Sequence, residues 1–134
     1  MSEYQLKKLK SCLLPETVYR QAVWAVKDLP RMREKLRILE SSLDSMPLTE
    51  TGQPRSSGNG YADLTAMRAS QIVNLTTRIH TIEECLKYVP EKYRDGILSK
   101  LAYGVPYPDS YHINTWKKWQ QTYLYQVALG LQLY

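Results

Sequence analysis

The chain has 134 residues, enough for one domain with a hydrophobic core and too few for a second domain of enzyme size. The formal net charge of +5 and the sequence pI of about 9.2 favour polyanionic partners. Cys12 and Cys85 are isolated and form no CxxC pair, which is typical of buried thiols in a reducing, cytoplasmic compartment. We expect no secretory leader and no membrane span, because apolar runs are far shorter than the ~18 residues that cross a bilayer.

The first predicted elements are two helices that meet at a bend at Pro30. Apolar residues recur at helical spacing from Pro15 to Lys27, and Pro30 suits the first turn of a helix. The second helix has a heptad seam with alternating steps of three and four: Leu29, Met32, Leu36, Leu39, Leu43 and Met46. We therefore predict an N-terminal helical arm over residues 1–46.

A flexible linker is predicted over residues 47–60, where proline, glycine and serine replace the periodic pattern. Periodicity then resumes over 63–88 and predicts a second long helix with a seam of its own: Leu64, Met67, Ile72, Leu75, Ile79, Ile82, Leu86 and Val89. The two seams have two interpretations, an intramolecular helical hairpin or bundle core, and a homodimer in which a seam pairs with its copy.

Two further helices are expected in a C-terminal domain over 61–134. Val89 and Pro90 end the long helix, and Pro90 begins a helix that ends near Gly104. Asp109 or Ser110 can cap the last helix. Its apolar stripe is Trp116, Trp119, Tyr123, Val127 and Leu131. No segment has the pattern of a strand, so we predict an all-α fold in which long helices form a hairpin or coiled-coil-like bundle.

Candidate catalytic and metal-binding groups are scarce. The chain has only two histidines, and His80 with Glu84 has the i,i+4 spacing of a metal pair but lacks further ligands. The glycine-containing run at 56–60 lacks the Lys-Ser/Thr of a phosphate loop. We expect no enzyme activity, no metal and no other cofactor.

The last helix carries the strongest functional pattern, because residues 111–134 contain no acidic side chain. The major groove of DNA presents base edges between two rows of phosphates, which disfavours carboxylates and favours amide, hydroxyl and cationic groups. The polar side of the predicted helix consists of Asn114, Lys117, Lys118, Gln121 and Tyr125.

The order of these parts resembles phage and prophage late transcriptional regulators of the RinA/ArpU type. The motifs are Pro-Arg-Ser-Ser-Gly (54–58), Val-Pro-Glu-Lys-Tyr-Arg (89–94), Asn-Thr-Trp-Lys-Lys-Trp (114–119) and Tyr-Gln-Val-Ala-Leu-Gly-Leu (125–131). The resemblance implies a C-terminal helix-turn-helix similar to the promoter-binding domain of sigma factors, with 114–121 as recognition helix. One part of that pattern is shortened, since only residues 107–112 are available where the family has its first motif helix.

Two functions follow as expectations. The first is a DNA-binding regulator of phage-type genes that contacts double-stranded DNA through His112, Asn114, Thr115, Lys117, Lys118 and Gln121. The second is a protein-interaction module with a degenerate helix-turn-helix, which binds RNA polymerase or another host protein. The 11 tyrosines and three tryptophans support this alternative, because such side chains are enriched at interfaces.

Overall fold

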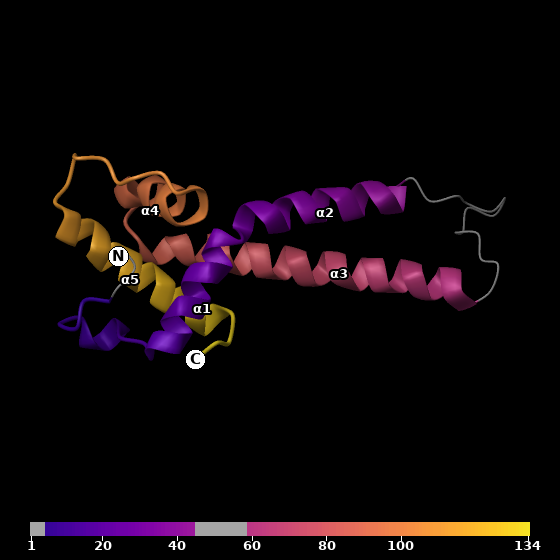
Figure 1. Cartoon of the computed structure of the whole chain (residues 1–134), viewed down its shortest axis with the longest axis horizontal. Coiled ribbons are helices and arrows are strands. Elements are labelled where there is room, and N and C mark those ends of the chain that lie inside the picture. The colour runs from indigo at the N-terminus through magenta and orange to yellow at the C-terminus, as the bar shows by residue number, and fades with distance from the viewer. Residues whose placement is uncertain (1–4, 45–58) are drawn as a thin grey trace. The chain divides into compact units, whose positions relative to one another are not determined.

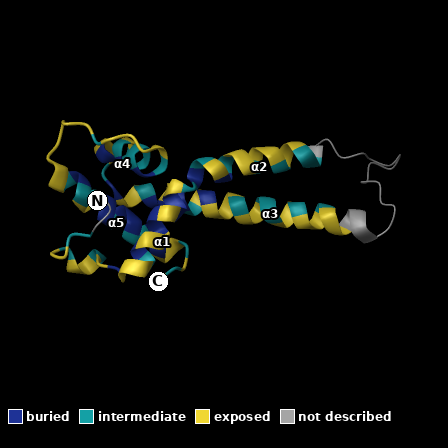
Figure 2. Cartoon of the chain, in the orientation of Figure 1, coloured by how far each residue is buried: buried dark blue, intermediate teal, exposed yellow. Residues whose placement is uncertain are grey.

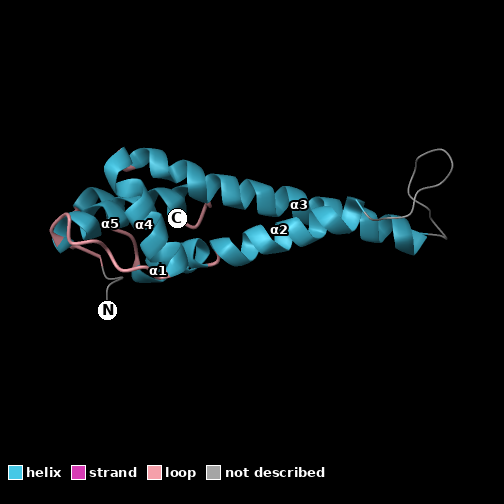
Figure 3. Cartoon of the chain, turned by 90° about the horizontal axis from the view of Figure 1, so that it is seen from above, coloured by secondary structure: helices cyan, strands magenta, loops and turns pink. Residues whose placement is uncertain are grey.

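The structure is a computed structural model that describes residues 5–44 and 59–134. In these two ranges the chain forms helices and no β-strand, which confirms the predicted all-α fold (Figures 1 and 3). The elements are the 3₁₀ turn η1 (Lys10–Cys12), α1 (Glu16–Lys27), α2 (Leu29–Asp44), α3 (Asn59–Glu84), the 3₁₀ turn η2 (Cys85–Tyr88), α4 (Glu91–Tyr103) and α5 (Ile113–Gly130). The predicted linker, 47–60, lies outside the described residues up to residue 58, and its last two residues instead begin α3.

Contacts divide the chain into two units, and the division differs from the predicted one. The first unit joins Met1–Pro30 to His80–Tyr134, and the second is Arg31–Ile79. The predicted arm is divided between the two units at Pro30, and α1 packs against both α4 and α5. The apolar face of α1, including Ala22 and Val26, is fully buried in that first unit.

The boundary between α1 and α2 lies where the sequence predicts it. Asp28 follows the last residue of α1 and its backbone N–H donates to Trp24 O at 2.9 Å. Pro30 is the second residue of α2, a position in the first turn where its missing N–H leaves no intrahelical bond unmade.

Within the unit Arg31–Ile79, α2 and α3 run in opposite directions (Figure 1). The seam leucines of α2, Leu36, Leu39 and Leu43, are half-buried, as are Ile72 and Leu75 on α3. The predicted seams are thus helical, as expected, but their burial varies (Figure 2). The buried seam residues are Leu29, Met32, Ile79, Ile82 and Val89, whereas Leu64 and Met67 are exposed.

The ends of α4 have direct causes in the sequence. Pro90 precedes the helix with ψ of 143°, and the Arg94 guanidinium donates to Val89 O at 2.7 Å. Gly104 ends the helix with φ of 70°, a left-handed conformation that glycine adopts without a side-chain clash. Val105 N then donates to Ser99 O at 3.1 Å, which closes the helix end.

The core of the first unit is built around α5. Trp116, Tyr123, Leu124 and Val127 of this helix are buried. This helix packs against α1, α4 and η2. The other buried side chains of the unit include Tyr19 and Val26 on α1, Ile97 and Leu101 on α4, Ile82 on α3 and Cys85 on η2. The last helix is therefore a central packing element as well as the candidate site.

Candidate nucleic-acid interface

The rotation of α5 is fixed by its buried face. The Tyr123 hydroxyl donates to Ile82 O at 2.8 Å, and the Trp116 indole N–H donates to Pro108 O at 3.2 Å. Both bonds join the inner side of the helix to backbone carbonyls elsewhere in the unit. The residues on the opposite side of α5 consequently form a surface with a defined orientation.

The expectation that Gln121 faces DNA is wrong. Its side chain is only 1% exposed, and its Nε2 donates to Leu6 O at 3.2 Å and to Cys12 O at 3.3 Å. Its Oε1 accepts from Leu6 N. The buried side chain thus binds three half-buried backbone groups of Leu6 and Cys12, so it is a structural anchor for the N-terminal segment.

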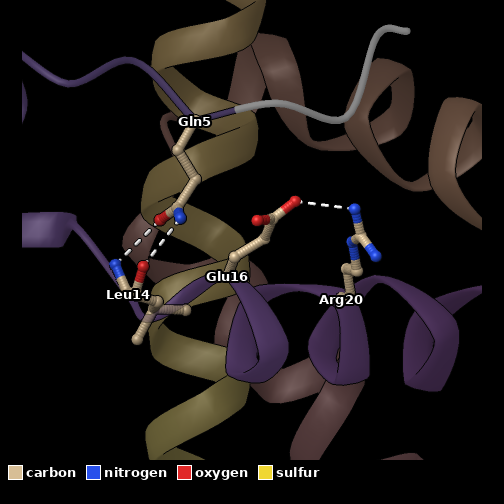
Figure 4. Close-up of polar contacts among 4 residues, drawn as sticks. All are labelled: Gln5, Leu14, Glu16 and Arg20. Carbon is tan, nitrogen blue, oxygen red and sulfur yellow. Dashed lines mark hydrogen bonds and ion pairs between the residues drawn. The ribbon is translucent and has the colours of Figure 1, made fainter.

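The N-terminal segment is closed by a second glutamine, Gln5. Its Nε2 donates to Leu14 O and its Oε1 accepts from Leu14 N, both at 2.8 Å (Figure 4). The loop from Gln5 to Leu14 is thus held at its ends by Gln5 and against α5 by Gln121. Sequence periodicity did not predict this structural role of either glutamine. The role depends on which backbone groups the fold brings within hydrogen-bonding distance of the side-chain amide.

The start of α5 differs from the predicted capping by Asp109 or Ser110. The Nδ1 atom of His112 accepts from Asn114 N at 3.1 Å, so His112 is the N-cap. Asp109 and Ser110 are exposed residues of the loop that follows α4. The Trp116 indole N–H, which donates to Pro108 O, holds the start of this loop against α5.

The two lysines of the predicted contact set point in different directions. Lys118 is exposed, and its Nζ lies 4.9 Å from the centre of the Trp119 ring. Lys117 is half-buried, because one residue turns the helix by about 100°. Asn114 is exposed beside Lys118, and Thr115 is half-buried.

The outer face of α5 contains two polar residues that the sequence interpretation omitted, Thr122 and Gln126. Both are half-buried and lie on the side opposite the core, with Asn114, Thr115 and Lys118. Trp119, which was assigned to the apolar stripe, is only half-buried and borders this face. The buried Gln120, Gln121, Leu124 and Ala128 move the centre of the core face away from Thr122 and Gln126.

A cation from α4 lies next to this face. Lys92 Nζ is 5.1 Å from the centre of the Tyr93 ring and 5.4 Å from that of Tyr111. Tyr93 in turn stacks on Trp119 with ring centres 6.0 Å apart. Lys92 and Lys118 therefore flank one pair of aromatic rings, which the sequence did not indicate because 26 positions separate them.

The segment between α4 and α5 contains no helix, as the shortened motif implied. Tyr107 stacks on Trp116 with ring centres 4.7 Å apart and an angle of 7° between the planes. Its hydroxyl donates to Gln120 Oε1, and Gln120 Nε2 donates to the Tyr19 hydroxyl at 3.4 Å. The loop is therefore packed onto α5 and α1, where a helix-turn-helix would have its first helix.

A comparison with protein-family models finds no match, and neither do comparisons with curated proteins and with solved structures. Within residues 5–44 and 59–134, no helix has the length and apolar character needed to cross a membrane. The same residues gather no three His, Cys, Asp or Glu side chains into a metal site. The resemblance to late regulators thus depends on the sequence motifs.

Proposed function

We propose that this protein is a transcriptional regulator of phage or prophage type that binds double-stranded DNA through the outer face of α5. The observation that carries the proposal is the composition of that face between Asn114 and Gln126. It presents amide, hydroxyl and amine groups and no carboxylate, while the inner face of the same helix is fixed in the core.

The surroundings of the helix support the same function. Lys92 and Lys118 lie where they can contact phosphates on either side of the Tyr93 and Trp119 rings. The N-terminal end of α5 adds the partial positive charge of a helix dipole. In this arrangement the lysines and the helix end bind the backbone, and Asn114, Thr122 and Gln126 contact base edges.

The test begins with selection of bound sequences from a pool of randomised double-stranded DNA, followed by mobility-shift titration at several salt concentrations. Lys118→Ala should weaken binding to all sequences alike and reduce the salt slope by about one. Asn114→Ala should relax preference at one position, by about 1–3 kcal/mol.

The matched control is Lys8→Ala, which removes the same charge from an exposed position in the N-terminal segment. It should leave the affinity nearly unchanged. Absence of binding to any DNA at low salt would overturn the proposal. An equal loss in Lys8→Ala and Lys118→Ala would also contradict it, because binding would then follow net charge alone.

A second candidate function is favoured by one specific surface, centred on Trp24 and Tyr103. Their side chains are 67% and 54% exposed, although both residues belong to helices of the first unit. Lys27 stands 5.1 Å from the Trp24 ring centre and, with Lys100 and Tyr103, lines an open hollow of about 530 Å³. Exposed tryptophan and tyrosine beside basic groups are typical of protein interfaces.

The alternative is therefore a module that binds RNA polymerase or another host protein. It is tested by affinity capture from nuclease-treated host lysate with the wild-type chain and with Trp24→Ala. A stoichiometric partner that Trp24→Ala loses and Lys118→Ala retains would favour this function over DNA binding.

A further inference from the structure

The segment before α1 and the first turns of α1 form an open hollow that the proposed function does not use. It has a volume of about 450 Å³ and is lined by Gln5, Lys7, Leu13, Leu14, Glu16, Tyr19 and Arg20. Sites for small organic molecules in proteins usually measure ~300–1,000 Å³. The hollow is therefore large enough for a small organic ligand.

One wall of the hollow is the segment before α1, which two glutamines hold in place. Gln5 binds the two backbone polar groups of Leu14, both at 2.8 Å (Figure 4). Gln121 attaches Leu6 and Cys12 of the same segment to α5. This wall is therefore held in one conformation before a ligand binds, which reduces the entropy that binding costs.

The two buried side chains that line the hollow, Leu14 and Tyr19, make its floor apolar. They are 4% and 3% exposed, and the Tyr19 hydroxyl accepts from Gln120 Nε2 at 3.4 Å on the side of α5. Leu13 also lines the hollow, and it is 39% exposed although it is apolar. A ligand with an apolar body would remove the Leu13 side chain from water, which favours binding.

The rim of the hollow is charged, with two cations and one carboxylate. The Arg20 guanidinium donates to Glu16 Oε1 at 2.7 Å, and Figure 4 shows both side chains rising from α1 on the side where Gln5 lies. A guanidinium has five N–H donors, so this bond leaves others for a ligand. Lys7 is exposed and makes no ion pair with another described residue. The rim therefore has an excess of positive charge.

We propose that this hollow binds a small organic anion that consists of an apolar body and one carboxylate. The apolar body lies on Leu14 and Tyr19 and against Leu13, and the carboxylate binds Lys7 and Arg20. Charge selects this class of ligand, because a cation would meet two like charges at the rim and a neutral molecule would gain no ion pair. For a ligand of ~11 non-hydrogen atoms at an open site, we expect a dissociation constant of about 1–10 mM.

The first experiment titrates the full chain with sodium hydrocinnamate, a phenyl ring on a short carboxylate chain, and follows backbone amide shifts by NMR at constant ionic strength. Saturable shifts are expected at the residues of the hollow, including Leu13, Leu14 and Tyr19. Hydrocinnamamide has the same apolar body without the charge, and it should bind about two- to fivefold more weakly. Absence of saturable shifts at the hollow up to about 20 mM would overturn the proposal. Equal affinity for the two compounds would overturn it too.

The second experiment repeats the hydrocinnamate titration with variants of exposed residues. Lys7→Ala should raise the dissociation constant about two- to fivefold, because one of the two cations is lost. Lys8→Ala is the matched control, since it removes the same charge from the next exposed position, which does not line the hollow. It should leave the constant within about 1.5-fold.

A third variant gives the opposite sign. Glu16→Gln should lower the dissociation constant about two- to fivefold, because the Arg20 guanidinium then no longer shares its charge with a carboxylate. Weaker binding to this variant would contradict the proposed role of Arg20. Equal effects of Lys7→Ala and Lys8→Ala would also count against the site, because affinity would then follow net charge alone.

Amide spectra of each variant without hydrocinnamate establish that the fold is retained. Neither experiment contains DNA, so a negative result leaves the proposed function of α5 untouched.

Discussion

Gln121 binds both backbone polar groups of Leu6, a residue 115 positions away along the chain. The Leu6 N–H donates to Oε1 and Nε2 donates to the Leu6 carbonyl oxygen at 3.2 Å. This pairing attaches the segment before α1 to the last helix. A residue that sequence patterning placed on a DNA-binding face is instead part of the fold.

Gln121→Ala should destabilise the protein by about 1–3 kcal/mol, because the half-buried Leu6 N–H and Cys12 carbonyl lose their hydrogen bonds to the Gln121 amide. Urea unfolding followed by circular dichroism measures the change in the free energy of unfolding. Gln21→Ala, at an exposed position of α1, is the control and should stay within about 0.5 kcal/mol of the wild type. Equal stability of the two variants would show that Gln121 is not an anchor.

Gly96→Ala should cost about 1–3 kcal/mol by overpacking. An added Cβ would lie 2.6 Å from two atoms of the Trp116 ring, closer than carbon atoms can approach. Combining it with Trp116→Leu provides a double-mutant cycle, since the smaller side chain removes the clash. We expect the combined loss to be clearly less than the sum of the single losses, and additivity would contradict the close contact.

Tyr123→Phe should lower the free energy of unfolding by about 1–2 kcal/mol, because the buried Ile82 carbonyl loses the hydroxyl that donates to it. Thermal and urea unfolding both measure this. Tyr125→Phe removes the same atom from a half-buried position on the other side of α5 and serves as the matched control. A similar loss of unfolding free energy in both variants would mean that the buried Tyr123 hydrogen bond contributes no more to stability than the Tyr125 hydroxyl does.

Burial raises the pKa of the Cys85 thiol; Lys87 opposes this shift and Glu84 adds to it. Above the ordinary thiol pKa of about 8.5, the unfolded chain releases this proton while the folded chain keeps it. Stability should therefore fall more steeply with rising pH in the wild type than in Cys85→Ala. Urea unfolding midpoints between pH 7.5 and 10 provide the comparison. If the midpoints of the two proteins changed with pH in parallel, a raised pKa of the Cys85 thiol in the folded chain would be contradicted.

His112→Ala should destabilise α5 by about 1 kcal/mol, since Asn114 N loses its capping acceptor. His112→Asn restores a capping oxygen and should recover most of the loss in urea unfolding. Comparison of the two variants in DNA titration separates the capping role from a direct contact. If asparagine restored stability but not affinity, the imidazole itself would contact DNA.

Much of the fold could be predicted from local chemistry. Pro30, Pro90 and Gly104 mark helix ends. Proline has a fixed φ and no backbone N–H, and glycine can adopt a positive φ, and these properties do not depend on tertiary contacts. The apolar spacing of α2 and α3 likewise predicts helices without tertiary information. The start of α5 was predicted wrongly, since Asp109 and Ser110 are favourable local caps but the Nδ1 atom of His112 caps the helix instead.

The candidate site shows the limit of this approach. Asn114 and Lys118 were found because an acid-free polar pattern is visible in sequence, whereas Lys92 required the stacking of Tyr93 on Trp119 to bring it near. Thr122 and Gln126 were missed because Gln121 was treated as a polar surface position, whereas the burial of Gln120 and Gln121 turns the core face of α5 away from Thr122 and Gln126.

The sequence by itself determined that the chain is helical, where most helices begin and end, and that its last helix lacks acidic side chains, since propensity, proline, glycine and charge act locally. Only the tertiary structure decided which side of that helix is buried. Gln120 and Gln121 lie inside because hydroxyl and backbone groups from distant segments satisfy their amides there. Burial of a polar side chain depends on such partners, and their positions follow from the packing of α1 and α4 on α5.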